Sequence, residues 1–301
     1  MPESFIEENS PMNLFKGVIT ALVTPIKNNH IDETSLRNLV EWQIENGIQG
    51  LVPCGTTGES ATLSTEEKKE VIHIVIDQAR KRVPVITGTG TNNTQESVKL
   101  STWAKEAGAD AILAVTPYYN KPSQEGLFRH YSELAKIGLP IILYNVPGRT
   151  SLSLSIDTID RLSKVKNIVA IKEATGSLDF GSQILKSGND IALISGDDFT
   201  FLPLLSIGAQ GVISVVSNVI PKEFSELYQH FTEGNLKEAQ RIHFKFYPLI
   251  QALFIETNPV PVKTALSLMK KISLEFRLPL CEMSPQNSEH LKLTLKNLEL
   301  I

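Results

Sequence analysis

Short runs of aliphatic and β-branched residues recur along this chain about every 30 residues, and polar segments with helical periodicity lie between them. This interval is the size of a strand followed by a helix and a return connection. The polar segments predict helices, among them Asp32–Asn46, Thr65–Arg80, Thr94–Ala107 and Gln124–Ile137. The eight runs that predict strands are Gly17–Thr24, Gly50–Cys54, Pro84–Gly88, Ala111–Thr116, Pro140–Val146, Ile168–Ala174, Ile191–Gly196 and Gly211–Val216.

Eight strands that are apolar on both faces and alternate with helices favour an α/β fold, in which a parallel sheet closes into a (β/α)8 TIM barrel. An open, doubly wound sheet has the same alternation and is the alternative on pattern alone. After the eighth run only helices are predicted, over Leu236–Ile255, Val260–Lys271 and Ser288–Leu300. We therefore expect a disordered or extended tail over residues 1–13, a catalytic barrel over 14–233 and a C-terminal helical domain over 234–301.

The composition argues against several classes of protein. The 301 residues carry a formal net charge of −4 with scattered basic residues, which predicts a globular protein without a nucleic-acid surface. No apolar stretch approaches the ~20 residues of a membrane span, and the first residues lack the features of a secretion signal. Cys54 and Cys281 match no metal spacing and the histidines form no close pair, so we expect a cytoplasmic protein with reduced thiols and no metal site.

A lysine interrupts the sixth apolar run. Alternation along a strand places Lys172 on the same face as Ala170 and Ala174, so its neighbours on that face are small. A charged amine in a buried strand is destabilising unless it is paired or neutralised, and burial favours the neutral, nucleophilic form of an amine. We therefore predict that Lys172 forms a Schiff base with a carbonyl substrate.

Catalytic side chains of a parallel barrel come from the C-terminal ends of its strands. The second run leads to Thr56 and Thr57 between two glycines, a pattern that suits binding of a small carboxylate and equally suits a plain tight turn. The fifth run places Tyr144 on the strand that precedes that of Lys172, where a phenol can transfer protons near the amine. Arg149 follows and could bind a substrate carboxylate, although a loop arginine is more often simply solvated.

Eight motifs occur in one order along the chain, and their order and spacing are more specific than any one of them. From about Phe15 to the C-terminus, the sequence resembles the dihydrodipicolinate synthase family of pyruvate-dependent class I aldolases, which also includes N-acetylneuraminate lyase. The motifs are GTTGES (55–60), GTGTNNT (88–94), TPYYNKPSQEGL (116–127), YNVPGRT (144–150), IKEATG (171–176), SGDD (195–198), GVISV (211–215) and NPVPVK (258–263).

The resemblance implies roles for the residues at the strand ends. Lys172 is expected to form the imine with pyruvate, and Thr57 to hold the pyruvate carboxylate. The hydroxyl proton relay of the family corresponds to Thr56, Tyr144 and Tyr119. The tyrosine that matches Tyr119 reaches into the site from a neighbouring subunit in family members, so the resemblance implies a homo-oligomer. A tetramer built from two tight dimers is the expected form.

The resemblance also implies the second substrate. Arg149 matches the residue that receives the carboxylate of L-aspartate 4-semialdehyde, and the main chain at Gly196 and Ile213 matches positions that line the pocket. The implied reaction condenses pyruvate with this semialdehyde to give 4-hydroxy-tetrahydrodipicolinate, in lysine and diaminopimelate biosynthesis. The iminium serves as the electron sink, so no cofactor is expected.

Two alternatives remain open at the level of sequence. One is a related pyruvate aldolase or lyase that acts on a sugar acid; its relatives commonly lack the arginine that follows YNVPG here. The other is a non-catalytic barrel that only binds a small carboxylate.

Regulation is the point at which the resemblance is incomplete. Where lysine-sensitive members usually carry histidines, this chain has Thr65 and Lys68. Lys68 would place like charge near a cationic effector, so we predict weak or absent lysine inhibition. The remaining positions of the possible allosteric lysine site correspond to Ser60, Ala61, Asn92, Glu96 and Tyr118.

Overall fold

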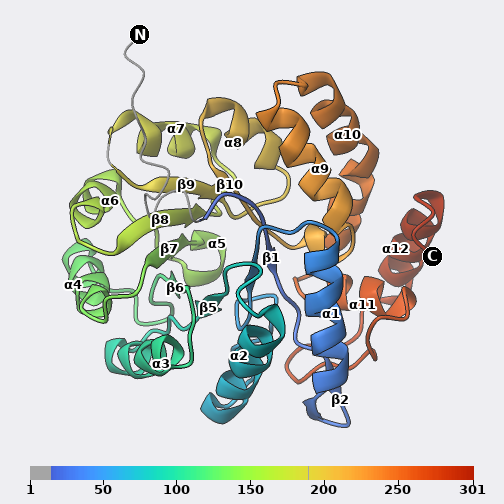
Figure 1. The fold of residues 1–301 in the computed structure, drawn as a ribbon, viewed down its shortest axis with the longest axis horizontal. Coiled ribbons are helices and arrows are strands. Elements are labelled where there is room, and N and C mark those ends of the chain that lie inside the picture. The colour runs from blue at the N-terminus through green and yellow to red at the C-terminus, as the bar shows by residue number, and fades with distance from the viewer. Residues whose placement is uncertain (1–14, 189) are drawn as a thin grey trace.

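The computed structural model describes residues 15–188 and 190–301. Its main sheet has eight strands in the order β4-β1-β10-β9-β8-β7-β6-β5, and each of its strand pairs is parallel. A parallel bridge from Leu51 to Val85 joins the two ends of this order, so the sheet closes into a barrel (Figure 1). The predicted TIM barrel is therefore confirmed, and the alternative of an open sheet is wrong.

Each of the eight predicted runs contains one barrel strand. All runs except Pro84–Gly88 extend past their strands at the C-terminal end, and the last one continues into the 3-10 helix η2 (Val216–Asn218). A short antiparallel hairpin of β2 (Ile26–Lys27) and β3 (His30–Ile31) follows the first strand. The barrel strands are β1 (Gly17–Ala21), β4 (Gly50–Val52), β5 (Ile86–Gly88), β6 (Ala111–Val115), β7 (Ile141–Asn145), β8 (Ile168–Glu173), β9 (Ala192–Ser195) and β10 (Gly211–Ser214).

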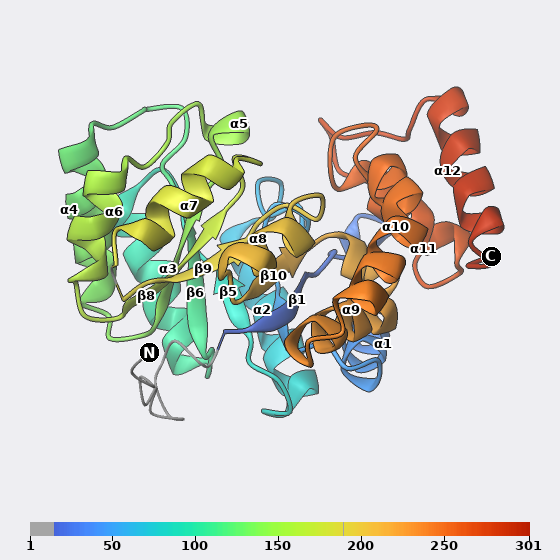
Figure 2. The same ribbon diagram turned by 90° about the horizontal axis from the view of Figure 1, so that it is seen from above.

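Helices surround the barrel, and the last three lie together on one side of it, far from α4 and α6 (Figures 1 and 2). The predicted tail over residues 1–13 lies outside the described residues, and the predicted domain boundary at residue 234 stays a prediction. The helices are α1 (Glu33–Glu45), α2 (Thr65–Ala79), α3 (Thr94–Glu106), α4 (Gln124–Ala135), α5 (Pro147–Thr150), α6 (Ile156–Ser163), α7 (Leu178–Lys186), α8 (Phe201–Ile207), α9 (Pro221–Thr232), α10 (Leu236–Leu253), α11 (Val260–Leu268) and α12 (Pro285–Asn297).

The barrel interior is filled by branched and small side chains that alternate with those facing the helices. Ala170 belongs to the interior cluster, together with Ile142 and Ile194 from the adjacent strands. Ile171, the next residue of β8, belongs instead to the cluster between the sheet and the helices. From Ala170 onward this alternation is the one predicted for β8, and it directs Lys172 toward the interior. Val169 departs from it, because it lies in the interior cluster beside Ala170, where the register with β7 is irregular.

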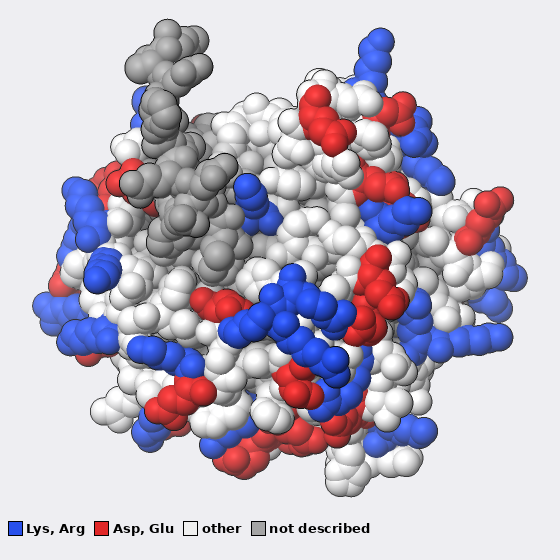
Figure 3. All heavy atoms as spheres, in the orientation of Figure 1, with Lys and Arg blue, Asp and Glu red and all other residues white. Residues whose placement is uncertain are grey.

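On the face drawn in Figure 3, basic and acidic side chains are interleaved, so neither sign of charge covers that face. None of the helices within the described residues combines the length and the apolar character needed to cross a membrane.

A buried amide joins helix α1 to the barrel. Gln43 has no exposed surface, and its Oε1 accepts a hydrogen bond from Thr20 Oγ1 at 2.7 Å. Its Nε2 donates to the carbonyl oxygen of Ser217 at 3.0 Å. Thr20 and Ser217 belong to the first and the last strand-helix units, so one side chain bonds to both units.

Gln43→Leu is expected to lower the free energy of unfolding by about 1–3 kcal/mol, because the Ser217 carbonyl loses its buried partner. Urea denaturation monitored by circular dichroism measures the change. Gln251→Leu, at an exposed position of α10, is the control and should shift the midpoint little. Equal stability of the two variants would contradict the role given to Gln43.

Candidate active site

A cavity of about 500 Å³ opens where several barrel strands end. Its wall is formed by residues at or beyond the C-terminal ends of β4, β5, β6 and β7. Two C-terminal segments, 257–259 and 279–280, complete the wall. The cavity therefore lies at the rim where parallel barrels carry their chemistry.

Lys172 and Tyr144 lie side by side at this rim. The register of β7 and β8 pairs the two residues directly. The Nζ of Lys172 lies 4.2 Å from the centroid of the Tyr144 ring, and only 6% and 7% of the two residues is exposed. Tyr144 lines the cavity whereas Lys172 does not. In the described part of the chain no carboxylate forms an ion pair with this amine.

Gly196 follows β9 and borders the lysine side chain. A Cβ atom at this position would lie 3.1 Å from Cε of Lys172 and 2.7 Å from Cβ of Ala174. The absence of a side chain at Gly196 therefore leaves the space that Lys172 occupies. Ile213 lies in the barrel interior on β10 and is buried. Neither Gly196 nor Ile213 is part of the cavity wall.

Thr56 and Arg149 line the cavity, and Thr57 is buried beside it. The side chain of Asn258 connects to this group: its Nδ2 donates to Thr57 Oγ1 at 3.0 Å. The main-chain oxygen of Asn258 accepts from Arg149 Nη2 at 3.1 Å. Asn258 thus contacts both Thr57, whose hydroxyl is predicted to hold the pyruvate carboxylate, and Arg149, which is predicted to bind the second substrate. The sequence showed it only as part of the motif NPVPVK, without a role.

Tyr119 is not part of the wall of the cavity in its own chain. Its side chain is 91% exposed, and its backbone has a φ of +71°, a left-handed conformation that is uncommon for residues other than glycine. The preceding residue, Tyr118, does line the cavity. Of the residues predicted for the catalytic relay, the structure brings Thr56 and Tyr144 together and leaves Tyr119 apart.

The predicted allosteric positions divide into two groups. Ser60, Ala61 and Tyr118 line the same cavity as Tyr144, and Lys68 joins them. The other two, Asn92 and Glu96, are not part of its wall. Glu96 forms an exposed ion pair of 2.9 Å with Lys99.

Buried carboxylates stabilise the strand ends around the site. Burial raises the pKa of Glu173, although its carboxylate accepts a hydrogen bond from the Thr175 N–H at 2.8 Å. Burial also raises the pKa of Asp197, and it raises that of Asp198 to about 6. Oδ2 of Asp198 accepts from the N–H groups of Val215 and Val216 at 3.0 and 3.1 Å. Asp198 therefore stabilises the turn that follows β10.

Other titratable groups near the cavity are unsuited to nucleophilic or metal chemistry. Burial raises the pKa of the Cys54 thiol to about 12, which makes it unreactive at neutral pH. Across residues 15–188 and 190–301, no group of three His, Cys, Asp or Glu side chains is placed to share a metal ion.

Sequence reasoning missed a buried ion pair at the cavity, whose wall includes Glu59. Lys263 on α11 and Glu59 in the loop after β4 form this pair, and both side chains are fully buried. Burial lowers the pKa of Lys263, while Glu59 acts in the opposite direction. The available signal was a lysine in the apolar run Val260–Leu268, the same signal that singled out Lys172.

Comparison with known proteins places the chain in a family. The model of the family described as the dihydrodipicolinate synthetase family matches residues 14–298. The chain is 55% identical to the 4-hydroxy-tetrahydrodipicolinate synthase of Oleidesulfovibrio alaskensis over 281 residues, which cover 92% of this chain and 96% of the relative.

Solved structures agree with these sequence matches. The crystal structure of dihydrodipicolinate synthase from Aquifex aeolicus superposes with a TM-score of 0.93 at 47% identity, covering 95% of this chain and 99% of that one. A structure described as the first monomeric dihydrodipicolinate synthase variant superposes with a TM-score of 0.94 at 43% identity, covering 97% and 99% of the two chains. Sequence and structure together show that this chain belongs to the dihydrodipicolinate synthetase family.

Proposed function

We propose that this chain condenses pyruvate with L-aspartate 4-semialdehyde through a Schiff base on Lys172, giving 4-hydroxy-tetrahydrodipicolinate. The observation that carries the proposal is the buried amine of Lys172 against the Tyr144 ring, at the C-terminal rim of the barrel. The relatives named above as synthases match this chain over nearly its whole length. The free thiols of Cys54 and Cys281 are consistent with a cytoplasmic protein in the lysine and diaminopimelate pathway.

The first half of the reaction forms the nucleophile. The neutral amine of Lys172 attacks the ketone carbon of pyruvate, and loss of one water converts the carbinolamine into the imine. Removal of a proton from the methyl group then gives an enamine, because the protonated imine accepts the electron pair. This electron sink lies within the substrate adduct itself, so the chemistry calls on no metal or organic cofactor.

The second half joins the two substrates. The enamine carbon adds to the aldehyde, and the amine of the semialdehyde then attacks the imine carbon. Ring closure expels the amine of Lys172, which returns the enzyme to its starting state. The water lost when the imine forms is the only other product, so the atoms balance.

The hydroxyl groups at the rim suit the proton transfers of this sequence. Tyr144 lies against the amine and lines the cavity, so its phenol can exchange protons with the carbinolamine oxygen. Thr56 extends the relay within the cavity. Thr57 would hold the pyruvate carboxylate, and its hydroxyl is oriented by the donated bond from Asn258. The main chain at Gly196 and Ile213 would border the bound keto acid.

Arg149 would bind the carboxylate of the semialdehyde at the mouth of the cavity. Its guanidinium is exposed and donates to the Asn258 carbonyl, which leaves other N–H groups for a substrate. A sugar-acid acceptor is not favoured, because the curated relative above is named as the synthase.

Tyr119 would complete the relay in a neighbouring subunit of a homotetramer built from two tight dimers. Support comes from its exposed side chain, its left-handed backbone and its absence from the cavity wall of its own chain. The fold alone does not fix the assembly, since one structural neighbour is described as a monomeric variant.

Borohydride reduction in the presence of pyruvate tests the Schiff base. We expect a stable pyruvate adduct on Lys172, located by peptide mass spectrometry, and none in Lys172→Arg, which retains the charge but not the nucleophile. An adduct at another lysine, or none in the wild type, would overturn the proposal.

Arg149→Ala is the matched variant for the second substrate. It should form the same adduct while kcat/KM for the semialdehyde falls by about 10- to 100-fold, as expected for a lost charge-assisted contact. Equal loss of trapping and turnover would contradict the role given to Arg149.

Subunit mixing tests whether Tyr119 acts across an interface. Tyr119→Phe should lower kcat by about 10- to 100-fold, the range for a lost proton-transfer group. A mixture of Tyr119→Phe and Lys172→Arg subunits should regain activity, because some mixed sites contain both native side chains. Sedimentation should show a tetramer. No recovery after verified exchange of subunits would show that Tyr119 does not act in trans.

Lysine inhibition should be weak. Millimolar L-lysine is expected to reduce the initial rate by less than half, because Lys68 places a positive charge at the cavity. Lys68→His is expected to make the enzyme more sensitive. Strong inhibition of the wild type would show that Lys68 does not block the effector.

A further inference from the structure

The chain contains a second buried lysine, which the Schiff-base chemistry does not use. Lys263 pairs with Glu59, and neither side chain has any exposed surface. Lys263 Nζ also donates to the carbonyl oxygen of Glu275 at 2.6 Å. Replacing a buried ion pair by apolar side chains is often neutral or stabilising for a protein. Stability alone therefore does not explain this pair, and its position in the fold becomes the relevant fact.

Glu59 lies at the centre of the loop after β4, which carries the hydroxyl groups of Thr56 and Thr57. Its N–H donates to the Thr56 carbonyl at 3.1 Å, and its own carbonyl accepts from the Thr62 N–H at 3.0 Å. Its backbone has a φ of +53°, which is uncommon for a residue other than glycine. The ion pair to Lys263 anchors this residue, so displacement of Glu59 would be transmitted to Thr56 through a single hydrogen bond.

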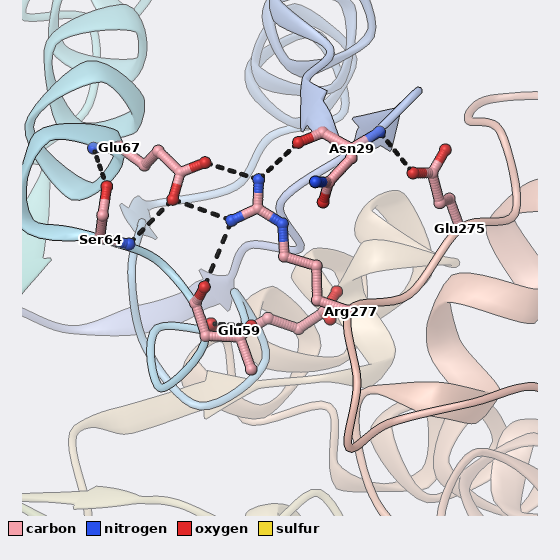
Figure 4. A network of polar contacts seen from close by, with 7 residues as sticks. Asn29, Glu59, Ser64, Glu67, Glu275 and Arg277 are labelled. Carbon is pink, nitrogen blue, oxygen red and sulfur yellow. Dashed lines mark hydrogen bonds and ion pairs between the residues drawn. The ribbon is translucent and has the colours of Figure 1, made fainter.

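The far end of the same loop is held by the same C-terminal segment. Arg277 binds Glu67 with two hydrogen bonds of 2.8 and 2.5 Å and donates to the Thr62 carbonyl at 3.2 Å. Glu67 also accepts from the Ser64 N–H at 2.8 Å, in the capping box that begins α2. Figure 4 shows the guanidinium of Arg277 between Glu67 and the hairpin residue Asn29.

Glu275 attaches the segment to the rest of the barrel. Its carboxylate accepts from the N–H groups of Asn28 and Asn29 at 2.8 and 2.6 Å, so the segment is fixed on the side away from the loop as well. We call Lys263, Glu275 and Arg277 the C-terminal clamp.

We propose that Lys263 is a positioning residue: through Glu59 it fixes the loop that presents Thr56 and Thr57, and it thereby sets the affinity of the site for its keto acid. The substrate readout rests on the function proposed above. The C-terminal helices, which supply no group to the Schiff base, would in this way determine how tightly the first substrate binds. Asn258, from the same part of the chain, adds a direct bond to Thr57.

The decisive variant is the double substitution Glu59→Met and Lys263→Met, which replaces the ion pair by two apolar side chains and leaves no buried charge. The protein should fold with a melting temperature close to that of the wild type. The pyruvate concentration that gives half-maximal borohydride trapping should rise by at least about tenfold, because small displacements of positioning groups have large effects. Saturating pyruvate should still label Lys172 fully. A half-saturating concentration within twofold of the wild type would overturn the proposal.

Hydrogen exchange provides a readout that does not depend on the reaction. The amides of Glu59 and Thr62 should exchange at least about tenfold faster in the double variant, since their acceptors belong to the loop itself. Unchanged exchange at both amides would overturn the proposal even if no pyruvate adduct formed in the wild type. Failure of trapping in the wild type would count against the proposed function alone.

Two further variants complete the design. Lys271→Met is the matched control, because Lys271 belongs to the same C-terminal region but lies over the Trp42 ring, 3.6 Å from its centroid. This variant is expected to show wild-type trapping.

Arg277→Gln removes the other contact of the clamp and keeps the test available if the double variant does not fold. A rise of about threefold in half-saturating pyruvate would support the clamp, and a wild-type value would overturn it.

Discussion

Closure of a parallel sheet is the constraint on which the rest of this structure depends. The bridge from Leu51 to Val85 completes a ring in which all eight strands point the same way. Side chains from distant parts of the sequence therefore meet at one rim. The pairing of Tyr144 with Lys172 is a direct consequence, because the register of β7 and β8 sets the two residues side by side.

Packing inside the ring then shapes the environment of the amine. The strand places Lys172 among small and branched side chains, and Gly196, just after the next strand, leaves room for its methylene groups. The only aromatic contact recorded for its Nζ in the described structure is the Tyr144 ring.

The C-terminal helices have a part in the site that barrel topology does not require. Asn258 binds both Thr57 and Arg149, and the clamp of Lys263, Glu275 and Arg277 holds the loop at its centre and near its far end. Residues outside the barrel strands are thus bonded to the loop that carries Thr56 and Thr57. This arrangement couples the folding of the last 40 or so residues to the geometry of the catalytic rim.

Much of the fold could be predicted because its signals are local. Apolar runs with period two, and polar segments with capping residues, depend only on neighbours in sequence, so all eight strands were identified. Strand ends were less accurate, since the run through Val216 turns into a 3-10 helix after Ser214. Lys172 was visible for the same local reason, as a charge within an apolar strand.

The sequence by itself determined the order of strands and helices, the buried lysine and, through its motifs, the family. Only the tertiary structure decided which partners those residues have. The bonds from Asn258 to Thr57 and from Lys263 to Glu59 span 201 and 204 residues, and no local pattern encodes such a pairing. The physical reason is that a strand or helix is specified by the period of its own side chains, whereas a buried ion pair exists only after the chain has closed on itself and excluded water.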